Sequence, residues 1–171
     1  MVPVKNIIGT YTATIPSHLP VTVVIPALNA ERFLSRTIDA VGPVHEVIVV
    51  DGGSRDRTAV LAREAGARIV CAPRGRGTQI AKGVAAARTP WLLILHADTR
   101  LQPGWQTEAR AHIAAGPERA ACFRFVLDSS KPQARRLERM VAWRSSVLRL
   151  PYGDQGLLIH VDLLRRVGGV R

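Results

Sequence analysis

The 171-residue sequence is poor in cysteine and in aromatic residues. It has two cysteines, Cys71 and Cys122, and its aromatic residues make up 5% of the chain. The cysteines lie in apolar sequence without C-x-x-C or metal-ligand spacing, which predicts two reduced thiols in the core of a cytosolic protein. The low aromatic content and the lack of an RNA- or DNA-binding motif argue against a nucleic-acid partner. We therefore expect a cytoplasmic protein that binds no nucleic acid.

Long hydrophobic runs and phosphate-binding glycine motifs are also absent from the sequence. Charged residues, Pro or Gly interrupt every apolar stretch well before the ~20 residues that a membrane-spanning helix needs. The first predicted strand is followed by Pro26-Ala27-Leu28-Asn29, not by G-x-G-x-x-G, and no G-x-x-x-x-G-K-[ST] occurs. These absences argue against an NAD-dependent oxidoreductase and a P-loop nucleotidase.

Acidic residues are scarce relative to basic ones. Lys and Arg total 24 and Asp and Glu total 13, which gives a formal net charge of +11. The excess is densest between Lys131 and Arg149, where six basic residues accompany a single acid, Glu138. Such a balance indicates an anionic partner: a nucleic acid, a membrane surface or a phosphorylated substrate.

The apolar pattern predicts a chain of alternating strands and helices. Residues 1–20 have no sustained periodicity and are expected to form an N-terminal extension, with one domain over 21–171. Predicted strands cover 21–25, 46–50, 67–72, 91–95 and 121–127, and predicted helices cover 33–41, 56–65, 78–88 and 103–115. Strands alternating with helices of this length favour an α/β fold with a mainly parallel sheet and helices on both faces.

Polar side chains follow three of the predicted strands. Asn29 comes after the first strand, Asp51 after the second and Asp98 after the fourth. Each residue alone is more often a helix cap or a turn former. Ligands of open parallel sheets bind outside the carboxyl ends of the strands, so the three side chains together predict a crevice at one edge. Its two carboxylates could hold a divalent cation and bind a ribose or a base.

Three segments in order resemble the family 2 glycosyltransferases of the GT-A fold. They are Val-Ile-Pro-Ala-Leu-Asn-Ala-Glu (24–31), Val-Val-Asp-Gly-Gly-Ser-Arg-Asp (49–56) and Leu-His-Ala-Asp-Thr (95–99). His-Ala-Asp-Thr together with Tyr-Gly-Asp-Gln-Gly (152–156) resembles the branch associated with radical-SAM and selenodomain genes. The resemblance covers the chain from about Val21 onward.

The resemblance implies a donor site for a nucleotide-diphosphate sugar. It places Pro26, Ala27, Asn29 and Glu31 near the base and ribose, with Asp51 bonding one of them. Asp98 corresponds to the metal-binding carboxylate of a D-x-D-type motif and would hold Mg²⁺ or Mn²⁺, which stabilises charge on the leaving group. His96 replaces the first Asp of that motif and either ligates the metal or braces the strand end. Arg76 either contacts the diphosphate or is a solvated surface charge.

The resemblance also concerns the catalytic base. Family members usually continue past the Gly-Gly that resembles Gly168-Gly169 to a Glu-Asp motif whose Asp deprotonates the acceptor. The sequence stops at Arg171 without that motif, so we expect a domain that is incomplete at its C-terminus. Asp154 is the acid left in this region and is the candidate catalytic residue, although it matches a different family position.

Two functional hypotheses follow. The first is an inverting, metal-assisted glycosyltransferase that moves a sugar from its nucleotide-diphosphate donor to a hydroxyl acceptor. The second is a sugar-nucleotide-binding module whose catalysis is impaired because the base is missing.

The basic segment from Lys131 to Arg149 has its own two interpretations. Leu137, Met140 and Val141 recur at helical spacing, which fits an amphipathic helix packed on the sheet. The same pattern, with Trp143 as an interfacial anchor, fits a helix on an anionic membrane. The second interpretation would place the protein peripherally on the inner face of the plasma membrane, near a lipid-linked acceptor.

Overall fold

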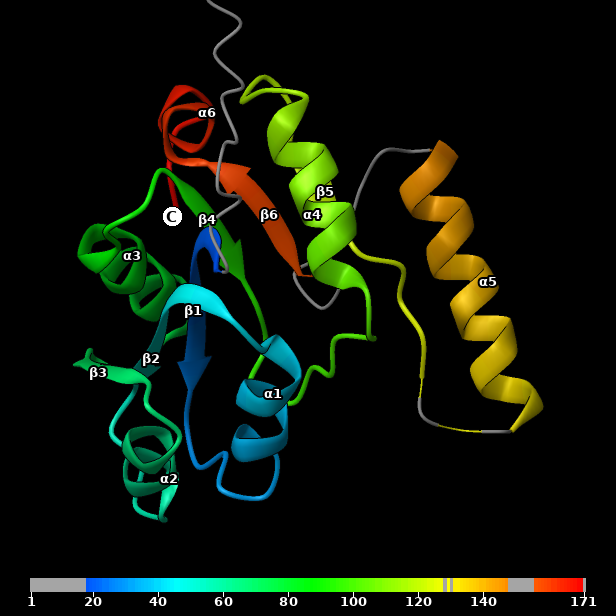
Figure 1. The fold of residues 1–171 in the computed structure, drawn as a ribbon. Helices are drawn as coiled ribbons and strands as arrows, with labels where there is room; N and C mark the ends of the chain where they lie inside the picture. The colour runs from blue at the N-terminus through cyan, green and yellow to red at the C-terminus, as the bar shows by residue number, and fades with distance from the viewer. Residues whose placement is uncertain (1–17, 128, 130, 148–155, 171) are drawn as a thin grey trace, which may run out of the picture.

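The computed structural model describes residues 18–127, 129, 131–147 and 156–170. Their centre is a six-stranded sheet in the order β3-β2-β1-β4-β6-β5 (Figure 1). The neighbours β1–β2, β1–β4 and β2–β3 pair in parallel, and β6 runs antiparallel to both β4 and β5. The strands are β1 (Leu19–Ala27), β2 (Val44–Asp51), β3 (Arg68–Cys71), β4 (Trp91–Ile94), β5 (Ala121–Cys122) and β6 (Leu157–His160).

Helices cover both faces of this sheet, as the apolar pattern predicts. On one face, α1 (Leu34–Val41), α2 (Thr58–Glu64) and α4 (Trp105–Ala114) pack against the largest apolar cluster. On the other face, α3 (Arg76–Ala86) and α6 (Val161–Arg166) cover two smaller clusters. The expected α/β fold with a mainly parallel sheet is confirmed.

The first strand is longer than the sequence indicates. The prediction begins it at Val21 and stops it at Pro26, whereas β1 begins at the fully buried Leu19 and continues through Pro26 to Ala27. The carbonyl of Val24 accepts a hydrogen bond from the amide of Leu95, so the backbone groups of Val24 point toward β4. Pro26, two residues later on the strand, directs its backbone to the same side. Because the β4 pairing ends at Ile94, beside Val24, no partner there requires the N–H that proline lacks.

Other boundaries differ by a few residues. Leu34, Ile38 and Val41 form the buried face of α1, but Phe33 precedes the helix and is 50% exposed. The strand predicted over 121–127 pairs only at Ala121 and Cys122, where β5 meets the first two residues of β6.

The prediction that both cysteine thiols are buried in the core is wrong. Cys71 and Cys122 are free, but both are exposed. Each lies on an edge strand, β3 or β5, where no further strand covers the side chain.

The remaining helix, α5 (Pro132–Val147), stands beside the sheet domain (Figure 1). Ala134, Glu138 and Val141 are buried, whereas Leu137, Met140 and Trp143 are among its exposed apolar residues. Among the residues that the structure describes, no helix has the length and apolarity needed to cross a membrane.

Candidate nucleotide-sugar site

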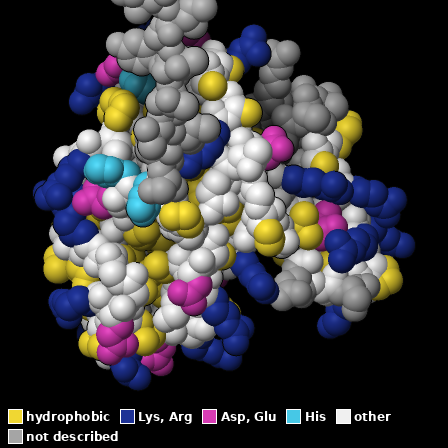
Figure 2. Space-filling model, in the orientation of Figure 1, with side chains coloured by type: hydrophobic (Ala, Val, Ile, Leu, Met, Phe, Trp, Pro, Cys, Tyr) yellow, Lys and Arg dark blue, Asp and Glu magenta, His cyan; other side chains and the backbone are white. Residues whose placement is uncertain are grey.

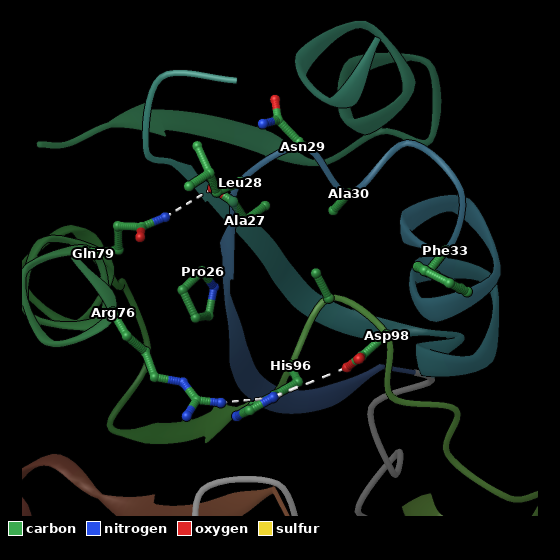
Figure 3. Close-up of a pocket in the computed structure, with 11 residues that line it drawn as sticks. Pro26, Ala27, Leu28, Asn29, Ala30, Phe33, Arg76, Gln79, His96 and Asp98 are labelled. Atoms are coloured by element: carbon green, nitrogen blue, oxygen red, sulfur yellow. Dashed lines mark hydrogen bonds and ion pairs between the residues drawn. The ribbon is translucent and has the colours of Figure 1, made fainter. Parts of the chain in front are cut away.

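A pocket of about 300 Å³ opens at the carboxyl ends of β1 and β4. In the sheet, β1 lies between β2 and β4. Helices α1 and α4, which follow β1 and β4, pack on the same face of the sheet. Such strand ends are where open α/β sheets bind ligands. The lining residues are Pro26, Ala27, Leu28, Asn29, Ala30, Phe33, Arg76, Gln79, His96, Ala97 and Asp98 (Figure 3).

The loop after β1 is held to the loop after β2 by reciprocal bonds. The Asn29 side-chain oxygen accepts from the Arg55 amide, and Asn29 adopts a left-handed backbone with φ of 51°. Glu31 accepts from the Arg57 amide, while its own amide donates to Asp56. Glu31 therefore ties the two loops together and does not line the pocket.

Asp51 lies at the last position of β2 and is 9% exposed. Its carboxylate accepts from the amide and the hydroxyl of Ser54, and the Ser54 oxygen accepts in turn from the Asn29 amide at 2.9 Å. Asp51 thus supports the Asn29 loop from behind, and it is not among the residues that line the pocket.

Three charged or ionisable side chains meet at the other side of the pocket. Arg76, from the first turn of α3, places Nη2 2.7 Å from Nδ1 of His96. The same Nδ1 lies 3.9 Å from Oδ1 of Asp98 (Figure 3). The backbone between them is fixed where the Thr37 hydroxyl donates to the carbonyl of Ala97 at 2.8 Å.

The short contact between Arg76 and His96 constrains the imidazole. A guanidinium can only donate hydrogen bonds, so a hydrogen bond between the two requires Nδ1 of His96 as the acceptor, which the tautomer with its proton on Nε2 provides. In this arrangement the lone pair of Nδ1 is already used. Asp98, whose side chain is 68% exposed, presents the carboxylate oxygens that Mg²⁺ and Mn²⁺ prefer.

Asp98 is therefore the residue that fits a divalent ion. Within the described part of the chain, no group of three His, Cys, Asp or Glu residues could hold a metal by itself. Mg²⁺ is commonly bound through one or two carboxylates together with substrate phosphates and water, so a single protein carboxylate is compatible with a metal site that a bound phosphate completes.

Of the residues predicted from the sequence, six line the pocket: Pro26, Ala27, Asn29, Arg76, His96 and Asp98. The catalytic candidate Asp154 lies outside the described residues. Sequence reasoning missed Gln79 and Phe33. Gln79 sits inside an Ala-rich helical segment, where an isolated amide gives no pattern that distinguishes it from a surface residue.

The comparisons with known proteins match one family over most of the chain. The model of the Glycosyl transferase family 2 covers residues 22–164. An uncharacterized glycosyltransferase of Mycobacterium tuberculosis is 40% identical over 99 residues, which cover 57% of this chain and 45% of that protein. Glucosyl-3-phosphoglycerate synthase of Mycolicibacterium paratuberculosis is 33% identical over 92 residues, covering 46% and 28%.

The solved structures agree with the fold. Glucosyl-3-phosphoglycerate synthase from Mycobacterium tuberculosis, in complex with Mn²⁺, UDP and glucosyl-3-phosphoglycerate, superposes with a TM-score of 0.63 at 23% identity. The match covers 86% of this chain and 58% of the synthase. This chain therefore spans only about half the length of the relatives it matches.

Proposed function

We propose that this chain, which belongs to glycosyl transferase family 2, transfers a sugar from a nucleotide-diphosphate donor to a hydroxyl acceptor. The observation that carries the proposal is the pocket at the ends of β1 and β4. It joins a polar loop at Asn29 to the charged group formed by Arg76, His96 and Asp98. A nucleoside at the first and a diphosphate at the second would span the pocket.

In this proposal, different residues of the site bind different parts of the nucleotide-sugar donor. Pro26, Ala27 and Asn29 would contact the base and ribose, with Glu31 and Asp51 holding the loop that carries them. Arg76 is exposed at the N-terminus of α3 and would donate hydrogen bonds to the diphosphate. The planar guanidinium can donate two parallel hydrogen bonds to one phosphate group.

Asp98 would hold a divalent ion, Mg²⁺ or Mn²⁺, with His96 held beside it by Arg76. The ion, when bound, would offset the charge that develops on the departing nucleoside diphosphate. The solved synthase structures that share the fold include complexes with UDP and either Mn²⁺ or Mg²⁺, which supports this choice of ions.

The acceptor side is proposed from the family. Attack by the acceptor hydroxyl on the face opposite the leaving diphosphate would invert the anomeric carbon. Asp154 is the candidate base in this chain. A solved synthase in complex with UDP-glucose contains glycerol 3-phosphate, a small phosphorylated alcohol, which supports a hydroxyl acceptor.

A peripheral contact with an anionic membrane is proposed for α5. Its described residues include the exposed apolar side chains of Leu137, Met140 and Trp143 beside the basic Arg136 and Arg139. Lys and Arg side chains gather over this part of the molecule in Figure 2. A basic helix with exposed apolar residues suits a bilayer surface, and it would bring the pocket towards a lipid-linked acceptor.

The donor site can be tested by equilibrium binding. We expect UDP or GDP to bind more tightly with Mn²⁺ than without it, and Asp98→Asn to lose about tenfold or more of the affinity measured with Mn²⁺ because the ion loses its protein carboxylate. Isothermal titration calorimetry of the wild type and the variant, each with and without Mn²⁺, measures both effects.

The matched control is Asp39→Asn, which neutralises an exposed carboxylate on α1 away from the pocket. It should bind the nucleotides as the wild type does. Metal-independent binding that Asp98→Asn leaves unchanged would refute the donor site. Release of free sugar or transfer to an alcohol, followed by NMR of the anomeric proton, then distinguishes an inverting transferase from a module that only binds.

A further inference from the structure

Helix α3 approaches the sheet unusually closely because of one glycine. A Cβ built on Gly83 would lie 2.3 Å from Cγ1 of Val24 and 2.8 Å from Cγ2 of Val50. Only a hydrogen fits there, so the helix backbone packs directly on β1 and β2. Gln79 and Arg76 lie one and two turns before Gly83, on the same helix face, and the close contact carries both toward the strand ends.

Gln79 uses this proximity to bind two strand carbonyls. Its Nε2 donates to the carbonyl of Ala27 at 2.8 Å and to that of Val50 at 2.7 Å. The residue is 4% exposed. Because only the NH₂ half of an amide can donate, these two acceptors fix which way the amide faces. Gly52 lies against the amide, and a Cβ there would come within 3.0 Å of it.

With Nε2 bound to the two strand carbonyls, the carbonyl oxygen Oε1 is the part of the Gln79 amide that is left to bind a ligand. Of the hydrogen bonds within the described chain, none reaches Oε1. Oε1 is not among the fully buried, unpartnered polar atoms of these residues, and Gln79 is one of the residues that line the pocket. Figure 3 shows the amide beside Ala27 and Leu28, across the pocket from Asp98. A buried acceptor held in this way favours a ligand that brings a donor.

We propose that Gln79 selects the nucleobase of the donor, with its fixed Oε1 accepting a hydrogen bond from a ring N–H of uracil or guanine. The proposal rests on the nucleotide-sugar function proposed above. Uracil has a donor at N3 and guanine has one at N1. Cytosine N3 and adenine N1 instead have lone pairs, which the Gln79 carbonyl would repel.

A ligand change tests this without altering the protein. We expect N3-methyl-UDP to bind the wild type about tenfold more weakly than UDP, because the methyl group removes the donor that Oε1 requires. If GDP is the tighter ligand, N1-methyl-GDP replaces it. Titration calorimetry gives both dissociation constants. Equal affinity for the methylated and the unmethylated nucleotide overturns the proposal whatever any variant does.

Two variants then assign the effect to Gln79. Gln79→Met removes the acceptor and both donors, whereas Gln79→Glu removes the donors but keeps an acceptor. The methyl penalty should disappear in Gln79→Met and persist in Gln79→Glu, with the folding of each checked by circular dichroism. A penalty that survives in a folded Gln79→Met assigns base selection to another residue and refutes the inference. If no nucleotide binds the wild type, the proposed function itself fails.

Discussion

At the scale of single residues, Glu138 shows how a carboxylate joins α5 to the segment after β5. Glu138 is 8% exposed, and its Oε1 accepts from the Leu127 amide at 2.8 Å. The Arg135 guanidinium donates to both carboxylate oxygens at 2.8 and 2.7 Å. The Leu127 amide, and then the Arg135 bonds, hold the pKa of Glu138 below its usual value.

This lowered pKa predicts a pH-dependent contribution to stability. A carboxyl whose pKa is lower in the folded state stabilises fully above its unfolded pKa of about 4.3, and the gain disappears as the pH falls through the folded value. Glu138→Gln should therefore lower the free energy of unfolding at pH 7 and have much less effect at pH 3. Urea denaturation of both proteins at the two pH values measures this.

Glu108→Gln is the matched control, since Glu108 is exposed on α4. It should change the free energy of unfolding little at either pH. A Glu138→Gln effect that is as large at pH 3 as at pH 7 would show that the lost bonds do not depend on ionisation.

The residues that sequence reasoning could place are those fixed by local pattern. Asn29 and Asp98 follow strongly apolar strands, so their position at the strand ends could be read directly. The role of Gln79 depends instead on which helix face meets the sheet and on a glycine one turn later. Asp51 could be placed at its strand end, but its bonds to Ser54 depend on how the next loop folds back.

At the scale of elements, α3 is positioned by Gly83. The two valines that face it belong to β1 and β2, so a side chain at 83 would push the helix away from both strands. The pocket residues Arg76 and Gln79 are carried on the same helix. The packing of one helix thus determines how far two pocket side chains reach.

Gly83→Ala is expected to destabilise the fold by about 1–3 kcal/mol, because the added methyl overlaps Val24 and Val50. It should also weaken nucleotide binding, since displacement of α3 withdraws Arg76 from His96. Urea denaturation and UDP titration measure the two effects. Lys82→Ala, on the exposed side of the same helix, should change the free energy of unfolding by less than about 0.5 kcal/mol. A stable, fully binding Gly83→Ala protein would contradict this account.

Elements were predictable where periodicity and burial agree, and less so at the edges of the sheet. The strands β1, β2 and β4 are flanked on both sides, and their apolar runs identify them. β5 is an edge strand of two residues, whereas the mostly apolar run over 121–127 predicts a longer one. Edge pairing depends on the length of the neighbouring strand, which a local pattern does not contain.

At the scale of the whole molecule, the net charge of +11 is not spread evenly. Residues 1–98 carry 11 basic and 7 acidic groups, and residues 99–171 carry 13 and 6. One basic group, Arg76, lines the pocket, whereas Arg135, Arg136 and Arg139 belong to α5. In our proposals these basic residues bind two different anionic partners: Arg76 binds a diphosphate, and the arginines of α5 bind a membrane surface.

The membrane contact predicts charge-dependent binding to vesicles. Wild-type protein should bind phosphatidylglycerol-containing vesicles more tightly than pure phosphatidylcholine, and high salt should weaken that binding. Each basic residue near an anionic surface contributes about 1 kcal/mol, so the double variant Arg136→Gln/Arg139→Gln should bind about thirtyfold more weakly. Vesicle sedimentation measures the affinities.

A matched control separates the position of the charge from its amount. Arg55→Gln/Arg63→Gln removes the same two charges at exposed positions outside α5, so it should bind vesicles much as the wild type does. Equal losses in the two double variants would mean that net charge alone attracts the protein. No difference between the lipid compositions would refute the contact. Self-association that Leu137→Ser abolishes, measured by light scattering, would instead assign the exposed apolar residues of α5 to a second copy of the chain.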